Sequence, residues 1–174
     1  MDVTFAPVET PEQQLELAKL ADEIWHEYWP ALIGTDQTDY MVDNFQSIEA
    51  IKRDMAENDY EYWFLEVVDG NGGKRVVGYT GGHDEPETNR YFISKIYLIA
   101  DERGRGFASR TIAFYENLCR ERGFRAMYLT VNKGNELGIR AYRGKGFETI
   151  EAVETDIGSG YIMDDYIMEK PVAL

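Results

Sequence analysis

The sequence has few of the residues that build disulfides or metal sites. Its 174 residues include one cysteine, Cys119, and two histidines. A single thiol excludes an intramolecular disulfide and a multi-cysteine metal site, and two isolated histidines provide no ligand cluster, so we expect no bound metal. Because Cys119 falls within an expected helix, we interpret it as a buried core thiol rather than a nucleophile.

Long apolar runs are also missing. No stretch approaches the roughly 18 apolar residues of a membrane-spanning helix, and Met1 to Phe5 lack the basic and apolar segments of a signal peptide. We therefore expect a cytoplasmic protein that does not contact a membrane. Repeats, low-complexity stretches and linkers rich in Pro or Ser are absent, so residues 1–174 are expected to form one domain.

Positive charge is scarce. The chain has 18 Lys and Arg residues against 32 Asp and Glu residues, which gives a formal net charge of −14. Such a surface repels nucleic acid and favours the approach of cations, so amines or basic peptides fit better as partners. Many cytosolic proteins are nevertheless acidic for solubility alone.

Apolar patterns and turn residues predict a mixed order of strands and helices. Thr10 is expected to cap a helix that begins at Pro11 and ends near Pro30, and Ser47 is expected to cap another. Asp69 to Gly73 predicts a hairpin turn. The further helices are expected at residues 36–45, 48–57, 105–122 and 135–145, and the strands at 3–8, 60–68, 74–81, 91–99, 125–131, 147–157 and 160–170. This order indicates a layered α/β or α+β fold rather than a repeating βαβ array.

The segment from Arg103 to Ala108 is the most informative part of the chain. Its glycines follow an apolar strand and precede an amphipathic helix, a position where unpaired backbone N–H groups and the helix dipole bind phosphate. A dinucleotide fingerprint requires a glycine where the chain has Ser109, and no Walker sequence is present. What remains is a compact anion loop, flanked by Arg103 and Arg105 as further candidate phosphate ligands.

Two motifs give the chain a resemblance to a known family. The segment Arg103-x-x-Gly106-x-Ala108 resembles the R/Q-x-x-G-x-G/A signature of the GNAT N-acetyltransferases. Downstream, Asn135, Tyr142 and Gly146-Phe147 match the family pattern N-x-x-A-x-x-x-Y-x-x-x-G-F, with Gly138 at the small-residue position. The resemblance extends from about residue 3 to 170. It implies a mostly antiparallel sheet of about seven strands flanked by about four to five helices.

The resemblance also implies roles for individual residues. Acetyl-coenzyme A is the expected cosubstrate, and Tyr142 is expected to protonate the departing thiolate. The cofactor-binding residues implied by the resemblance are Ile96, Tyr97 and Leu98 for the pantetheine arm, Arg103, Gly104, Arg105, Gly106, Phe107, Ala108 and Ser109 for the pyrophosphate, and Asn135 for the cofactor arm. Tyr142 also fits a core aromatic, Asn135 a simple helix cap, and the arginines plain surface charges.

The general base is not evident from the sequence. Some family members carry a glutamate on the strand at 125–131, and this chain has Thr130 at that position. Other candidates are His26 and Glu27 on the first helix and His83, Asp84 and Glu85 after the third strand. Proton loss to bulk water is the remaining alternative.

Aromatic and acidic residues suggest where an amine binds. Trp25, Tyr28 and Trp29 on the first helix, together with Asp164 and Asp165 near the end of the chain, suit an alkylammonium group. The segment 156–170 also resembles a bacterial GNAT subgroup that includes polyamine N-acetyltransferases. We therefore expect direct acetyl transfer to a primary amine such as a polyamine. The alternatives are acetylation of a protein α-amine or lysine, and a non-catalytic acyl-coenzyme A-binding or dimerising module. GNAT domains commonly form homodimers.

Overall fold

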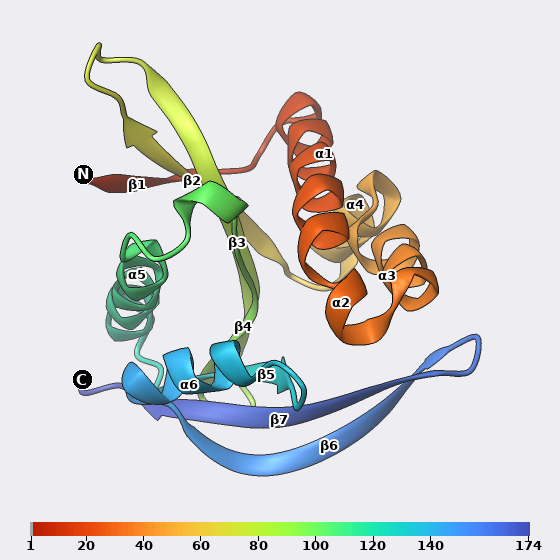
Figure 1. Cartoon of the computed structure of the whole chain (residues 1–174). Coiled ribbons are helices and arrows are strands. Elements are labelled where there is room, and N and C mark those ends of the chain that lie inside the picture. The colour runs from red at the N-terminus through yellow and green to blue at the C-terminus, as the bar shows by residue number, and fades with distance from the viewer. Residues whose placement is uncertain (1) are drawn as a thin grey trace. The chain divides into compact units, whose positions relative to one another are not determined.

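A computed structural model describes residues 2–174, which form seven strands and six α-helices (Figure 1). The strands are β1 (Val3–Pro7), β2 (Glu61–Val68), β3 (Lys74–Glu85), β4 (Arg90–Leu98), β5 (Ala126–Asn132), β6 (Glu148–Gly158) and β7 (Tyr161–Pro171). The helices are α1 (Pro11–Tyr28), α2 (Pro30–Ile33), α3 (Thr35–Met41), α4 (Ile48–Glu57), α5 (Phe107–Arg122) and α6 (Glu136–Gly144), with a π-helix at Val42–Gln46 and a 3-10 turn at Ala100–Glu102.

The strands form a mixed sheet in the order β1-β2-β3-β4-β5-β7-β6. The pairs β1–β2, β2–β3, β5–β7 and β6–β7 are antiparallel, whereas β4 and β5 run parallel. This arrangement confirms the expected seven-stranded, mostly antiparallel sheet. None of the described helices is long and apolar enough to span a membrane.

Local sequence signals place the helix ends. Thr10 accepts a hydrogen bond from the Gln13 N–H at 3.2 Å, and the Gln13 side chain accepts one from the Thr10 N–H at 2.9 Å. This capping box, with Pro11 in the first helical position, confirms the predicted start of α1. Ser47 caps α4 in the predicted way, because its hydroxyl accepts a hydrogen bond from the Ala50 N–H at 3.2 Å.

Two helical segments differ from the expectation. Pro30 does not simply end the first helix but begins the short helix α2, because proline fits the first turn of a helix, where its missing N–H is not needed. The single helix expected at 36–45 is divided into α3 and the π-helix. With α2, the structure has six α-helices, one more than the four to five expected.

The described chain divides into two compact units. Unit 1 comprises the chain up to His83 together with Lys95–Thr111, and unit 2 comprises Asp84–Ser94 and Ile112–Leu174. In unit 1, α1 and α4 pack over strands β2 and β3 through buried residues that include Leu17, Ile24, Ile51, Phe64 and Tyr79. In unit 2, the buried residues include Tyr91, Tyr115, Met127, Leu129 and Met168.

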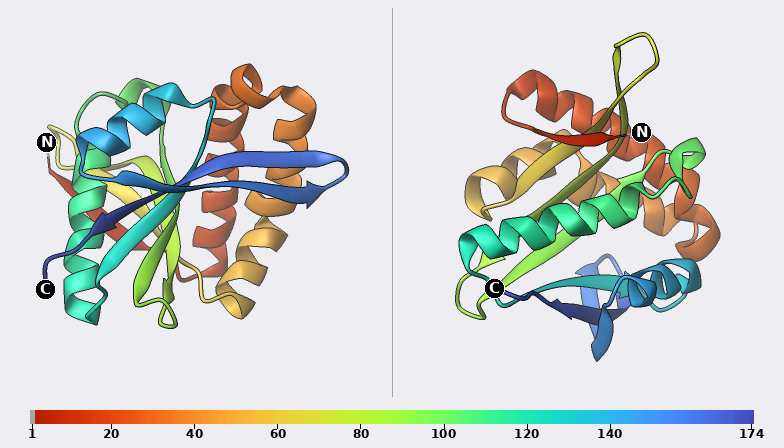
Figure 2. Two further views of the ribbon diagram at one scale, coloured as in Figure 1. Left: turned by 90° about the horizontal axis from the view of Figure 1, so that it is seen from below. Right: turned by 90° about the vertical axis from the view of Figure 1, so that its left-hand side faces the viewer.

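Strands β6 and β7 form a long hairpin in unit 2 (Figure 2). Its turn contains three consecutive residues with positive φ, namely Gly158, Ser159 and Gly160, at 94°, 53° and 80°. Glycine at two of these positions allows the turn without a Cβ penalty. The hairpin predicted around residues 158–160 is confirmed.

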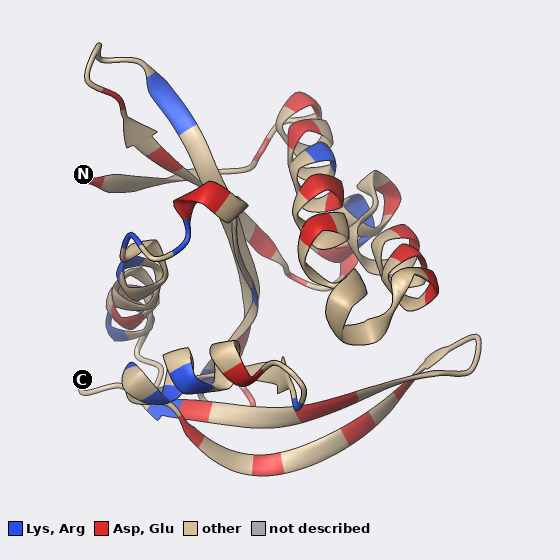
Figure 3. Cartoon of the chain, viewed as in Figure 1, with Lys and Arg blue, Asp and Glu red and all other residues tan. Residues whose placement is uncertain are grey.

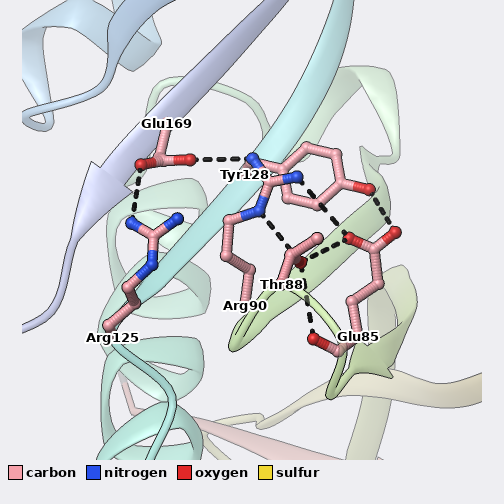
Figure 4. Close-up of polar contacts among 6 residues, drawn as sticks. All are labelled: Glu85, Thr88, Arg90, Arg125, Tyr128 and Glu169. Carbon is pink, nitrogen blue, oxygen red and sulfur yellow. Dashed lines mark hydrogen bonds and ion pairs between the residues drawn. The ribbon is translucent and has the colours of Figure 1, made fainter.

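A network of charged and aromatic side chains connects β3, β4, β5 and β7 within unit 2 (Figure 4). The Arg90 guanidinium donates to Glu169 at 2.8 Å, lies 3.9 Å from Glu85 and covers the Tyr128 ring at 4.1 Å from its centroid. Arg125 also donates to Glu169, at 3.3 Å. Arg90 is the more buried of the two arginines, with 18% of its side chain exposed against 54% for Arg125.

Replacement of Arg90 by methionine is therefore expected to destabilise the protein by about 2 kcal/mol, because two partly buried carboxylates lose their main counter-charge. The exposed Arg125→Met variant serves as the matched control and should cost less than about 1 kcal/mol. Urea denaturation measures both values. Equal losses would show that burial of the Arg90 ion pairs does not matter.

Candidate active site

The predicted anion loop lies in unit 1, between β4 and α5. Gly104 and Gly106 have positive φ values of 78° and 85°, which favour glycine. A Cβ added at either residue meets no atom within 4 Å, so backbone conformation rather than crowding requires glycine. The sequence predicted helix from residue 105, but α5 begins at Phe107 because these two glycines leave the helical region.

The loop presents a run of unpaired backbone donors. Among residues 2–174, none accepts a hydrogen bond from the N–H groups of residues 104–109, and the first bond of the turn runs from Arg110 N–H to Gly106 C=O at 3.2 Å. These six groups stand at the positive end of the dipole of a 16-residue helix. The arrangement fits a phosphate or pyrophosphate group.

The Arg103 side chain is directed toward helix α1. Its guanidinium forms a bidentate ion pair with Glu27, with donor–acceptor distances of 3.2 and 2.6 Å, and it lies 5.0 Å from the centre of the Tyr28 ring. It also donates to the Leu98 carbonyl at 3.2 Å. A phosphate contact by Arg103 stays a prediction, and it requires this side chain to share or leave Glu27.

Arg105 has a carboxylate beside it as well. Its guanidinium lies 3.5 Å from the Glu102 carboxylate, which is buried and also pairs with Arg75. About half of the Arg105 side chain remains exposed, at 53%. The sequence analysis missed Glu27 and Glu102 as partners of the loop arginines, although Glu102 directly precedes Arg103.

Strand β4 leads into the loop through the predicted pantetheine-binding residues Ile96, Tyr97 and Leu98. The pairing of β4 with β5 covers Arg90–Phe92, and these three residues lie beyond it along β4. On β3, a Cβ at Gly78 would lie 2.3 Å from the Tyr97 carbonyl oxygen, so only glycine permits this close approach of the two backbones.

The second motif lies in unit 2, at helix α6. The Asn135 side chain accepts a hydrogen bond from the Gly138 N–H at 3.1 Å and so caps the helix. A Cβ at Gly138 would lie 2.6 Å from Asn135 Nδ2, which explains why the smallest residue fits this motif position. The structure therefore supports the helix-cap interpretation of Asn135, while a cofactor contact by its side chain stays a prediction.

Tyr142 lies in the last turn of α6 and is half-buried. Its ring packs edge-on against the buried Phe147, with 5.7 Å between the ring centres. Gly146, with a φ of 94°, allows the chain to turn from α6 toward β6, and the Phe147 N–H donates to the Tyr142 carbonyl at 3.1 Å. The motif residues Tyr142, Gly146 and Phe147 thus fix one another's positions.

The three predicted aromatic substrate residues differ in exposure. Trp25 is 4% exposed, and its indole N–H donates to the Tyr79 hydroxyl at 3.2 Å, so it belongs mainly to the core of unit 1. Trp29 is 9% exposed and packs between Trp25 and Tyr28. Tyr28 is the one of the three with substantial exposed surface. The role of all three in substrate binding stays a prediction.

The two predicted acidic residues of β7 lie in different environments. Asp164 pairs with the Lys133 ammonium at 2.5 Å. Asp165 is buried, with 5% exposure, and burial raises the pKa of its carboxyl from 3.8 to about 6. A carboxylate with such a pKa changes protonation state close to neutral pH.

The candidate bases on α1 and at the end of β3 all have partners. His26 Nε2 lies 2.7 Å from Asp39, a hydrogen bond that raises the pKa of the imidazole, and Glu27 pairs with Arg103. Asp84 pairs with Arg122 at 2.7 Å, and Glu85 accepts a hydrogen bond from the Tyr128 hydroxyl at 2.7 Å. The His83 ring packs at a tilt against Tyr60, with 5.0 Å between the ring centres.

Two further groups are buried but have structural explanations. Cys119 is fully buried, and burial raises the pKa of its thiol to about 11, which confirms a core thiol rather than a nucleophile. Lys95, which the sequence analysis missed, donates to the Tyr62 hydroxyl at 2.7 Å, and burial lowers its pKa to about 8.

Residues 2–174 contain no group of three potential metal ligands.

Comparison with known proteins shows similar sequences and folds. An uncharacterized N-acetyltransferase of Bacillus subtilis, YycN, is 26% identical over 107 residues, which span 60% of this chain and 66% of that protein. The PaiA N-acetyltransferase of Thermoplasma acidophilum, crystallised with coenzyme A, matches with a TM-score of 0.75 and 18% identity over 98% of this chain and 99% of that one.

A chimera of the Vibrio cholerae spermidine N-acetyltransferase SpeG and hSSAT matches with a TM-score of 0.69 and 17% identity, over 98% of this chain and 96% of that one. These structural likenesses show the fold. The sequence pattern of the acetyltransferase (GNAT) family matches residues 21–147, which include both motifs and most of the chain. This protein therefore belongs to the GNAT family of acetyltransferases.

Proposed function

We propose that this protein transfers the acetyl group of acetyl-coenzyme A directly to a primary amine. The observation that carries the proposal is the run of six unpaired N–H groups from residues 104 to 109, at the start of α5 and within the family motif. These donors suit the pyrophosphate of the cofactor. The backbone of Ile96 to Leu98 would bind the pantetheine arm, as the family resemblance implies.

Tyr142 is the proposed general acid. Departure of the coenzyme A thiolate is easier when a proton reaches the sulfur, and a phenol is a suitable donor. The packing of Tyr142 against Phe147 and the turn at Gly146 limit the movement of its ring. Asn135 is proposed to contact the cofactor arm in addition to capping α6.

The proposed acceptor is a small cationic amine such as a polyamine. Asp and Glu residues occur on α1, α3 and α4 in unit 1 and along β6 and β7 in unit 2 (Figure 3). Together with the net charge of −14, they favour the approach of cations. The fold shared with a spermidine N-acetyltransferase chimera is in keeping with such an acceptor. A cytoplasmic location and a homodimer stay predictions.

The first test is an acceptor screen. Release of coenzyme A is measured with spermidine, spermine, amino acids and short peptides, and the polyamines are expected to give the highest kcat/KM. Preference for peptides would replace the small-amine acceptor by a protein amine. Binding of acetyl-coenzyme A in a calorimeter, without thiol release for any amine, would contradict catalysis.

Tyr142→Phe is expected to lower kcat at least tenfold, because the thiolate loses its proton donor while the ring packing is kept. The KM for acetyl-coenzyme A should change less than threefold. Steady-state kinetics separate the two constants. An unchanged kcat would remove Tyr142 from the role of acid.

Gly106→Ala is expected to raise the KM for acetyl-coenzyme A by about tenfold, because a Cβ disfavours the positive φ that aligns the loop donors. Gly123→Ala provides the matched control. Gly123 has a similar φ of 78° and free space around its Cβ position, but it lies at the other end of α5. Both variants should lose similar thermal stability, and only Gly106→Ala should lose cofactor affinity. Equal KM values would contradict the proposed role of the loop.

A further inference from the structure

Asp165 is a buried carboxylate without a partner. It lies on β7, where its backbone is opposite Asn132 of β5 on one side and Val153 of β6 on the other. The residue is 5% exposed, yet within residues 2–174 its side chain takes part in no hydrogen bond or ion pair. Its neighbour Asp164, by contrast, pairs with Lys133 at 2.5 Å.

Strand register places Asp165 on the same face of the sheet as Thr130 of β5. Paired residues of antiparallel strands point to the same face, and residues two apart along a strand share that face. Asp165 and Ile167 therefore share a face with their partners Asn132 and Thr130. Thr130 is exposed and is a diagonal neighbour of Asp165, at about 7–8 Å between backbones.

The Asp165 carboxylate is not completely sealed from solvent. Its oxygens are absent from the described side-chain atoms that have neither solvent contact nor a hydrogen-bond partner. A desolvated carboxylate without a partner is costly, and a cation that binds next to it removes that cost.

The charged groups around Asp165 do not neutralise it. Asp164 and Glu169 lie on its own strand, and Glu151 of β6 shares its face one pair away. Residues 130–132 of β5 carry no charge. Lys133, the one nearby cation that lowers the pKa of Asp165, pairs directly with Asp164, and burial together with Asp164 raises that pKa to about 6.

We propose that Asp165 binds the acceptor ammonium and serves as the general base that removes its proton. The inference rests on the proposed amine acetyltransferase function and assigns to β7 the carboxylate that β5 lacks at Thr130. Unlike Asp165, the candidate bases Glu27, Asp84 and Glu85 are all bound to other side chains.

The proton balance is as follows. The Asp165 carboxylate takes one proton from the ammonium and later passes it to water. The neutral nitrogen then forms a bond to the thioester carbonyl carbon, and the carbon–sulfur bond breaks. The nitrogen loses its second proton, and the departing sulfur gains one. The products are the acetamide, coenzyme A as the thiol, and one proton in water.

The test compares Asp165→Asn with wild type in steady-state kinetics against the best amine of the screen. The variant is expected to lose about 100-fold or more in kcat/KM for the amine, with the dissociation constant for acetyl-coenzyme A unchanged in a calorimeter. The kcat/KM of the wild type should decrease as the pH is lowered, with an apparent pKa of about 6. This acidic limb of the pH profile should be absent in the variant. Asp165→Glu, which keeps the carboxylate, should retain the limb at reduced rate.

Glu151→Gln is the matched control, because it removes one exposed carboxylate from the same face. It should stay within about twofold of wild type. If Asp165→Asn is equally active and keeps the acidic limb, the inference fails while the acetyltransferase function stands. If wild type itself acetylates no amine, both fail.

Thermal stability separates a folding defect from a lost base. The folded protein binds the Asp165 proton more tightly than the unfolded chain does, so this group lowers the stability of the fold as pH rises from 3.8 to about 6, and the loss is complete above that. Asp165→Asn should therefore have the same Tm as wild type near pH 4 and a higher Tm at pH 7. A lower Tm at pH 7 would show that the carboxylate has a stabilising partner, which overturns the proposal.

Discussion

The unpaired N–H groups at the start of α5 are the physical feature on which the functional account depends. A helix leaves its first donors without internal acceptors, and the positive φ values of Gly104 and Gly106 extend that run into the loop. The donors belong to the backbone, so side chains along the loop can vary as long as the two glycines remain. The buried residues of unit 1, such as Phe107 at the first position of α5, hold this helix end in place.

Electrostatics near the loop differ from a simple basic phosphate site. Both loop arginines lie beside carboxylates, Arg103 at Glu27 and Arg105 at Glu102. Their charge is therefore largely balanced before any anion binds, in a protein that is strongly acidic overall. The backbone donors and the helix dipole remain as the main attraction for pyrophosphate. The same acidity that disfavours anions in general favours a cationic acceptor.

Much of the fold and part of the site could be predicted from the sequence, because the signals are local. Thr10 and Ser47 were expected to cap helices, and each accepts a backbone hydrogen bond in that position. Asn135, for which capping was the alternative to a cofactor contact, also accepts one. The glycine turn at 158–160 likewise determines its hairpin. The short helix α2 was missed, because proline at 30 equally fits a helix end and a helix start.

Contacts between residues far apart in the sequence could not be predicted. Nothing local indicates that Arg103 meets Glu27, 76 residues away. Asp164 and Asp165 are identical and adjacent in the sequence, yet only the strand register and burial show that one is paired with Lys133 and the other has no partner. The structure, and not the sequence, therefore distinguishes Asp165 from the candidate bases whose side chains have partners.

The most direct test of the central claim is an NMR titration of the backbone amides with coenzyme A. The account predicts that the amide signals of residues 104–109 shift more than those at the other end of α5. Pantetheine, which lacks the pyrophosphate, should leave them nearly unchanged. Binding of coenzyme A without shifts at residues 104–109, or equal shifts with pantetheine, would contradict the account.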